Sequence, residues 1–271
     1  MNYKMIVLDL DGTLTNRDKV ITDKTRQALM EAQKRGKKVV LASGRPTYGV
    51  VPLAEELELG NYGGGILSFH GGIIMDCRTG EVLFQKKLPA EANRKIIGLA
   101  QEERVSSILT YQDGLIITDN EECPYVKIEA GINHLKVRQV GSMADYVDFS
   151  VPKFLMCDDG DYLALTEARV KAALGRDFSV YRSEPFFLEI LPKGIDKAQS
   201  LSQLLKVLGI EREEMIACGD GYNDISMIQY AGLGVAMENA VLPVRKAADY
   251  VTLSNNDDGV AHGMEQKILL N

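Results

Sequence analysis

The chain has 271 residues, and its 31 Lys and Arg residues against 38 Asp and Glu residues leave a formal net charge of −7. This acidic balance argues against nonspecific binding to nucleic acid or to an anionic membrane, because both require a basic face. No apolar run approaches the roughly 20 residues of a membrane span and the start of the chain lacks a signal-peptide cleavage pattern, so we expect a cytoplasmic protein.

Short apolar runs alternate with helical periodicity at both ends of the chain. The first part predicts strands over 4–10 and 38–42, a helix over 22–35, a helix beginning at Pro46 and a hairpin over 72–85. The last part predicts helices over 198–208, 224–230 and 240–247, and strands over 215–218, 234–236 and 250–252. Alternating strands and helices are typical of a parallel sheet covered on both faces.

The middle of the chain follows a different pattern. It predicts helices over 90–104 and 161–174, with strands near 107–111, 115–118, 153–157, 178–182 and 186–190. Strands that follow one another in this way indicate an α+β arrangement. We therefore predict a parallel α/β domain into which a second domain is inserted.

Two carboxylates follow the first predicted strand, at the edge where open α/β sheets bind ligands. Asp9 and Asp11 are two residues apart, and such residues of a strand point the same way. Two like charges ~4 Å apart repel by about 4 kcal/mol at an effective dielectric near 20, so the pair implies a cation, a shared proton or wide exposure. An acidic surface turn remains an alternative. A calcium loop does not fit, because its last ligand position falls on Val20.

A second acidic group follows a later strand, in residues 219–224 (GDGYND). Its glycines resemble a dinucleotide fingerprint, but Asp220 would face the pyrophosphate, which argues against nucleotide binding of that kind. Mg²⁺ fits better, because it takes oxygen ligands together with substrate phosphate. Zinc and a disulfide framework do not fit, since the four cysteines are scattered singly; we expect buried, reduced thiols.

Two further features suit a phosphate. Ser43 and Gly44 follow the second strand and offer a hydroxyl and helix-start N–H groups to a phosphoryl oxygen. Lys197, early in a later helix, can supply a fixed positive charge. Taken alone, each of these is equally typical of a helix cap or a solvated side chain.

In this order the elements resemble the haloacid dehalogenase-like superfamily, and within it the Cof-type phosphatases with a large cap. The D-x-D-G-T motif matches residues 9–13, the second motif Ser43, the third Lys197, and G-D-x-x-N-D residues 219–224. Residues 187–190, 234–240 and 258–261 also look like this family. The resemblance implies a Rossmann-like parallel-sheet core over 1–82 and 190–271, with an inserted α+β cap domain over 83–189.

The resemblance also implies an activity. It indicates a Mg²⁺-dependent phosphomonoesterase that hydrolyses small phosphorylated metabolites, mostly sugar phosphates, through an aspartyl-phosphate on Asp9, with Asp11 as general acid and base. The implied metal residues are Asp9, Asp11 (through its backbone carbonyl), Asp220 and Asp224. The implied phosphate-binding residues are Ser43, Gly44, Lys197 and Asn223. The cap would exclude water and select the substrate.

One position departs from the family pattern. His70 stands where the family typically has Asn, and we favour a structural role for it over a substrate contact. Two other functions stay open. A phosphosugar mutase would use the same nucleophile, whereas a noncatalytic phosphosugar-binding protein is disfavoured because every catalytic position is filled.

Overall fold

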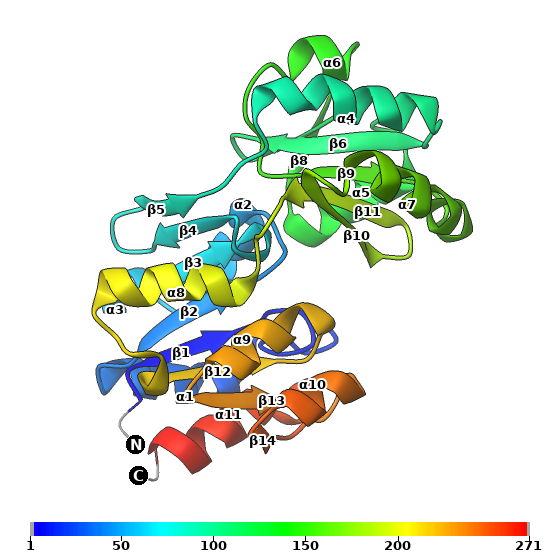
Figure 1. The fold of residues 1–271 in the computed structure, drawn as a ribbon. Coiled ribbons are helices and arrows are strands. Elements are labelled where there is room, and N and C mark those ends of the chain that lie inside the picture. Colours follow the sequence, from blue (N-terminus) through cyan, green and yellow to red (C-terminus); the bar gives the residue numbers. More distant parts are fainter. Residues whose placement is uncertain (1–2, 270–271) are drawn as a thin grey trace. The chain divides into compact units, whose positions relative to one another are not determined.

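The computed structural model describes residues 3–269, which form two compact units (Figure 1). One unit contains the chain up to Gln85 and from Asp196 onward, and the other is Lys86–Ile195. The expected boundaries after residues 82 and 189 cut through two strands, β5 (Val82–Gln85) and β11 (Phe187–Pro192). β5 pairs with β4, and β11 pairs with β9 and β10, so each strand belongs as a whole to its own unit. These pairings are not visible in the local apolar pattern of the sequence. None of the described helices is long and apolar enough to cross a membrane.

The first unit is built on an eight-stranded sheet in the order β14-β13-β12-β1-β2-β3-β4-β5. The first six strands of this order are parallel, and the hairpin of β4 and β5 adds antiparallel strands at one edge. The other strands are β1 (Met5–Leu8), β2 (Lys38–Ala42), β3 (Gly65–Ser68), β4 (Ile73–Asp76), β12 (Met215–Gly219), β13 (Leu233–Ala236) and β14 (Tyr250–Val251). From β1 the chain adds β2 to β5 on one side of the sheet, and later it adds β12, β13 and β14 on the other side. The strand order therefore reverses between β1 and β12. Ligands bind at such a reversal of strand order.

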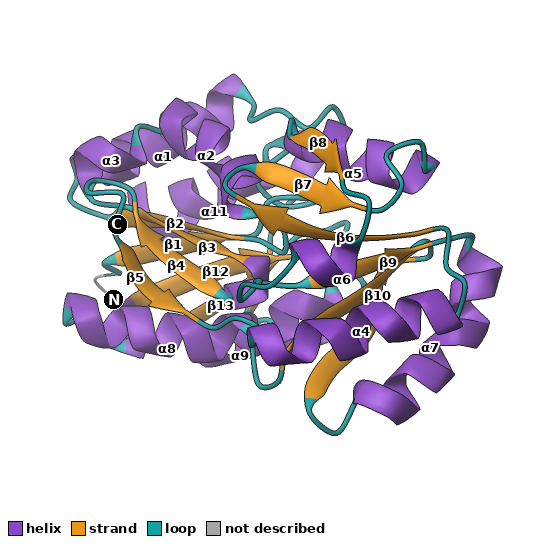
Figure 2. Ribbon diagram, turned by 90° about the horizontal axis from the view of Figure 1, so that it is seen from above, coloured by secondary structure: helices purple, strands orange, loops and turns teal. Residues whose placement is uncertain are grey.

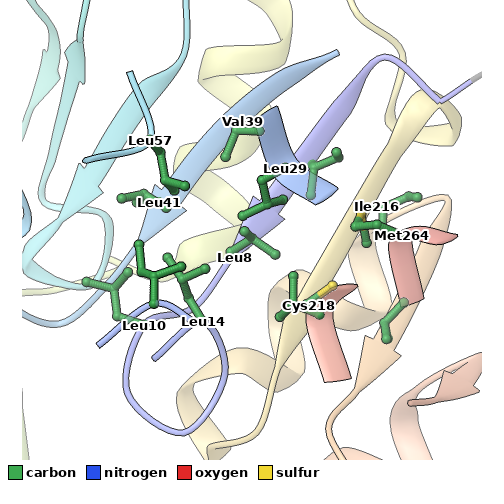
Figure 3. Packing of buried hydrophobic residues seen from close by; sticks show 14 of the residues in the cluster. Leu8, Leu10, Leu14, Leu29, Val39, Leu41, Leu57, Ile216, Cys218 and Met264 are labelled. Carbon is green, nitrogen blue, oxygen red and sulfur yellow. The ribbon is translucent and has the colours of Figure 1, made fainter. Parts of the chain in front are cut away.

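Helices cover both faces of this sheet, as Figure 2 shows for α1, α2 and α11 on one side and α8 and α9 on the other. Ile6 and Leu8 of β1 pack against α1, whereas Met5 and Val7 pack on the opposite face against α8. Figure 3 shows the first of these two cores. Burial on both faces explains why the strands read as continuous apolar runs. The helices are α1 (Asp23–Lys34), α2 (Thr47–Glu56), α3 (Leu59–Tyr62), α8 (Lys197–Leu208), α9 (Ile225–Tyr230), α10 (Leu242–Ala247) and α11 (Gly259–Met264).

The predicted boundaries of α1 are confirmed within one residue. The side chain of Thr22 accepts a hydrogen bond from the backbone N–H of Thr25, which satisfies one of the free donors of the first turn. Beyond the last turn, Gly36 adopts a φ of +82°, which a glycine tolerates easily. The helix therefore begins and ends where the local signals place it.

The second unit carries a six-stranded sheet in the order β10-β11-β9-β6-β7-β8, antiparallel except for the pair β7 and β8. One face packs against α4, α6 and α7. Its remaining elements are α4 (Ala90–Glu102), β6 (Ser107–Gln112), β7 (Leu115–Thr118), α5 (Pro124–Asn133), β8 (Lys136–Gln139), α6 (Met143–Tyr146), β9 (Phe154–Cys157), α7 (Gly160–Leu174) and β10 (Phe178–Glu184). The α+β pattern of the sequence is confirmed, although α5, β8 and α6 are additions to it.

Leu29 tests the packing of α1 on the sheet. It is fully buried among the residues of Figure 3, so Leu29→Ala should lower the free energy of unfolding by about 2–5 kcal/mol through lost burial and a residual cavity. Val207 on α8 is 64% exposed, so Val207→Ala should change that free energy by no more than about 0.5 kcal/mol. Urea unfolding followed by circular dichroism measures both variants, and equal losses would contradict the packing described.

Candidate active site

Three carboxylates meet at the carboxyl ends of β1 and β12. Asp9 follows β1, Asp220 follows β12, and Asp224 ends the short 3-10 helix Tyr222–Asp224. One oxygen atom from each lies within 4.8 Å of the others. β1 and β12 are parallel neighbours, and the backbone N–H of Asp9 donates to the carbonyl of Cys218 at 3.0 Å. The sheet edge therefore brings together the acidic groups that the two sequence motifs predicted.

Lys197 places one buried ammonium group among these carboxylates. Its Nζ donates to Oδ1 of Asp9 and to Oδ1 of Asp224, both at 2.6 Å, and its side chain is only 1% exposed. Lys197 is the first residue of α8, which the side chain of Asp196 caps. Three ionised carboxylates around one ammonium leave two negative charges unbalanced. Because unpaired buried charge is costly, the donor set fits a divalent cation that prefers oxygen ligands.

The pKa values of the group reflect this crowding. Burial raises the pKa of Asp9 well above its usual value and the charge of Asp224 adds to the shift, while Lys197 opposes both. Burial also raises the pKa of Asp220 to about 6, against a hydrogen bond from Thr13 and together with the charge of Asp224. Burial alone would lower the pKa of Lys197, but Asp224 and Asp9 outweigh it and raise that pKa. A cation would stabilise the ionised carboxylates.

Asp224 also organises the loop that carries Asp220. Its Oδ2 accepts hydrogen bonds from the backbone N–H groups of Asp220 and Gly221, at 3.0 and 2.9 Å. Its Oδ1 meanwhile holds Lys197. One side chain thus connects the loop after β12 to the first turn of α8.

The side chain of Asp11 faces different partners from that of Asp9. Arg45 donates to both of its oxygens, from Nε to Oδ2 at 2.7 Å and from Nη2 to Oδ1 at 2.6 Å, and Lys19 Nζ donates to Oδ1 at 2.7 Å. Asp9 and Asp11 both lie beyond the end of β1 at Leu8, and Gly12 turns the chain with a φ of +86°, so strand alternation does not set the directions of their side chains. Their place in one crevice stays a prediction. The metal role expected for the backbone carbonyl of Asp11 stays a prediction.

The ion pairs of Asp11 also separate it from Asp9 in acidity. Burial raises the pKa of Asp11, but the hydrogen bonds and charges of Arg45 and Lys19 outweigh burial, so the pKa is lower than usual. The two carboxyls of the first motif are therefore shifted in opposite directions. Such a separation is typical of carboxyls with different roles at one site.

The residues expected to bind phosphate are distributed around the same sheet edge. Ser43 and Gly44 follow β2, the parallel neighbour of β1, and Ser43 Oγ accepts a hydrogen bond from the backbone N–H of Arg45 at 3.1 Å. Asn223 is exposed on the short helix before Asp224. Ser43, Gly44 and Asn223 are not members of the carboxylate–lysine group, and their phosphate-binding roles stay predictions.

His70 belongs to a strained turn that supports the loop after β2. Phe69 and His70 have φ values of +52° and +59°, a region that costs a residue other than glycine about 1–3 kcal/mol. The backbone N–H of His70 donates to the carbonyl of Ser43, and that of Phe69 to the carbonyl of Arg45, both at 3.0 Å. The imidazole lies so close to Gly44 that a Cβ there would overlap it. The backbone of His70 therefore supports the loop after β2, and the structural role favoured for its side chain stays a prediction.

Three residues of the site were not identified as such from the sequence. Arg45 holds Asp11, Thr13 Oγ1 donates to Asp220 Oδ1 at 2.8 Å, and Asn239 Nδ2 donates to the carbonyl of Gly12 at 2.8 Å. Thr13 and Asn239 lie within stretches that resemble the family pattern, and Arg45 directly follows Gly44. Their partners are distant in sequence, so local patterns alone do not predict these contacts.

Several known proteins resemble this chain over almost its whole length. The haloacid dehalogenase-like hydrolase family matches residues 6–264. The crystal structure of a haloacid dehalogenase-like hydrolase from Bacteroides thetaiotaomicron is 48% identical, with a TM-score of 0.94, over 97% of this chain and 99% of that one. The phosphatase YwpJ of Bacillus subtilis is 30% identical, over 97% of this chain and 99% of that protein. A subclass IIB sugar phosphatase of the same superfamily is 26% identical, with a TM-score of 0.83, over 97% of this chain and 98% of that one.

Substitution of Gly12 tests whether the turn after β1 determines the position of Asp220 in the acidic group. A Cβ at this position would overlap the carboxylate of Asp220, whereas a Cβ at Gly36 would meet nothing, although the two glycines have similar φ values of +86° and +82°. Both Gly12→Ala and Gly36→Ala should lose about 1–2 kcal/mol of stability from the unfavourable φ. Only Gly12→Ala should weaken Mg²⁺ binding as well, because it displaces Asp220. Calorimetric Mg²⁺ titration checks this, and unchanged binding in Gly12→Ala would refute it.

Proposed function

The chain belongs to the haloacid dehalogenase-like hydrolases and is a phosphatase, and from this premise we propose the reaction it performs. It is a Mg²⁺-dependent phosphomonoesterase for small phosphorylated metabolites, above all sugar phosphates, and it acts through an aspartyl-phosphate. The carboxylate–lysine group at the ends of β1 and β12 is the observation that carries the proposal. It combines a nucleophile, a buried ammonium and two unbalanced negative charges at one sheet edge.

The cation would be held by Asp9, Asp220 and Asp224, with the backbone carbonyl of Asp11 as a further ligand. These are hard oxygen donors, which is the ligand chemistry of Mg²⁺. When bound, Mg²⁺ supplies the positive charge that lets an anionic phosphate ester approach an anionic carboxylate.

Asp9 is the nucleophile of the first step. Its carboxylate oxygen forms a bond to phosphorus while the bond from phosphorus to the ester oxygen breaks, and one difficult displacement becomes two easier ones. Lys197 already donates to one oxygen of Asp9, so its ammonium lies beside the reacting group. It stabilises the negative charge of the phosphoryl oxygens in the transition state, together with Ser43, the N–H groups near Gly44, and Asn223.

Asp11 transfers the protons. It gives a proton to the departing alkoxide and later removes one from the water that hydrolyses the aspartyl-phosphate. Arg45 and Lys19 favour its ionised form, which suits the removal of a proton from water, so Asp11 must take up a proton before it serves the leaving group.

We infer the substrate class from the relatives of this chain and not from a particular side chain. The similar subclass IIB protein is a sugar phosphatase, which supports a polyhydroxylated phosphate ester as substrate here. We assign the choice among such esters to the unit Lys86–Ile195, as the cap of this enzyme. All four cysteines are free thiols, which supports the reducing environment of the cytoplasm.

Mg²⁺ dependence follows from the unbalanced charge of the site. Excess chelator should abolish phosphate release from hexose phosphates, and added Mg²⁺ should restore it. Mg²⁺ should also raise the melting temperature of the parent protein but not that of Asp220→Asn. Because the pKa of Asp220 is raised to about 6, protons should compete with the cation there, so Mg²⁺ affinity should fall as the pH drops below this value. Full turnover in excess chelator would exclude the proposed metal site.

The two carboxyls of the first motif should fail in different ways. Asp9→Asn should abolish turnover of every ester, because no aspartyl-phosphate can form. Asp11→Asn should slow alkyl phosphates by about 10²–10⁴, since an alkoxide leaves poorly without a proton. With an aryl ester, whose nitrophenolate leaves unaided, Asp11→Asn should release about one equivalent rapidly and then stall for want of the base.

Rapid-mixing kinetics with nitrophenyl phosphate measure this burst. Asp23→Asn, an exposed carboxyl in the first turn of α1, is the matched control and should keep the parent rates. Parent rates for both ester classes in Asp11→Asn would remove Asp11 from the mechanism. Sustained hydrolysis without a bisphosphate activator separates a phosphatase from a mutase.

A further inference from the structure

Arg45 makes a contact that neither the metal site nor the phosphate-binding residues require. We propose that Arg45 is a positioning residue, which fixes the carboxylate of Asp11 in the orientation from which it exchanges protons with the leaving group and with water. The inference rests on the proposed phosphatase mechanism. It adds to that mechanism a residue that acts only through Asp11.

Two hydrogen bonds between Arg45 and Asp11 fix the orientation of the carboxylate. Nε and Nη2 of the guanidinium each donate to a different oxygen of the carboxylate, at 2.7 and 2.6 Å. Such a two-point contact fixes both the distance and the plane of the carboxylate. The side chain of Arg45 is 11% exposed, whereas that of Lys19, which makes a single contact, is 56% exposed. Arg45 is therefore the partner that determines where the carboxylate lies, since exposed single ion pairs contribute little.

The backbone of Arg45 is held on both sides. Its N–H donates to Ser43 Oγ at 3.1 Å, and its carbonyl accepts from the N–H of Phe69 at 3.0 Å. The next residue, Pro46, is the N-cap of α2. The guanidinium therefore extends from a rigid loop after β2 to the turn after β1.

Asn239 and Thr13 hold the backbone of the turn after β1, whereas Arg45 and Lys19 hold the carboxylate of Asp11. Asp11 lies beyond the end of β1, next to Gly12, and only two residues from Asp9 in the chain. The bidentate contact fixes the orientation of this carboxylate. Together with the contact from Lys19 to Oδ1, it leaves an acceptor site on Oδ2 for the proton.

The test compares Arg45→Met, Arg45→Lys, Asp11→Asn and the double variant Arg45→Met/Asp11→Asn. The substrates are glycerol phosphate, which needs the acid, and nitrophenyl phosphate, which does not. We expect Arg45→Met to slow glycerol phosphate turnover by about 10²-fold, the usual effect of a displaced catalytic group, while the nitrophenolate burst keeps the parent rate. In the Asp11→Asn background, Arg45→Met should have no further effect on either substrate.

Two controls separate positioning from other roles. Arg26→Met removes an exposed guanidinium that pairs with Asp23 on α1, and it should match the parent. Arg45→Lys keeps the charge but not the two-point contact. Its turnover of glycerol phosphate should therefore also fall, by less than in Arg45→Met, while its nitrophenolate burst keeps the parent rate. If Arg45→Met does not fold, as judged by circular dichroism, the ratio of the two substrate rates in Arg45→Lys decides the question.

Two results would overturn the proposal. An equal loss for the burst and for glycerol phosphate, or a further loss in the double variant, would show that Arg45 contacts the phosphoryl group directly. An unchanged glycerol phosphate rate in Arg45→Met would show that Asp11 needs no such support. Failure of the proposed function is a different outcome, since the parent protein would then release no phosphate from either ester.

Discussion

The site depends on one buried ammonium. Lys197 lies between Asp9 and Asp224 with a contact of 2.6 Å to each, and it unites the first strand, the helix α8 and the loop after β12. Removing one partner from a buried charged group of this kind costs about 3–5 kcal/mol, because the remaining charges are left uncompensated. The same ammonium is too little charge for three carboxylates, and burial together with the charge of Asp224 raises the pKa values of Asp9 and Asp220.

Asp9 and Asp11 show how one short motif places two carboxyls in different surroundings. They share residue type and lie two positions apart, but one is crowded by like charge and the other is bound by two cations. The difference arises in the turn at Gly12 and in the neighbouring loop that carries Arg45. The motif can therefore be read from the sequence, whereas the opposite pKa shifts of its two carboxyls come from the contacts that each makes in the folded chain.

The sequence predicted elements whose signals are local and failed where the signal is a distant partner. α1 has a cap at Thr22 and a regular apolar face, so its bounds were predictable. β8 is a short strand of mostly exposed residues that lacks such a pattern, and only its pairing with β7 defines it. The positions of Asp9 and Asp220 were predictable in the same way, because each directly follows a predicted strand of the parallel sheet and the carboxyl ends of such strands lie at one edge. The contacts of Thr13 and Arg45 cross 207 and 34 residues of chain, and no local pattern encodes them.

The insertion of the second unit determines when the site can form during synthesis. Asp9 and Arg45 leave the ribosome early, whereas Lys197, Asp220 and Asp224 follow only after the whole of Lys86–Ile195 has been made. Until then β1 lacks its parallel neighbour β12 and has only β2 beside it. Because domains tend to fold as they emerge, the inserted unit can fold while the unit that surrounds it is still incomplete. The sheet of the unit that carries the candidate site therefore cannot be completed until the inserted unit has been made.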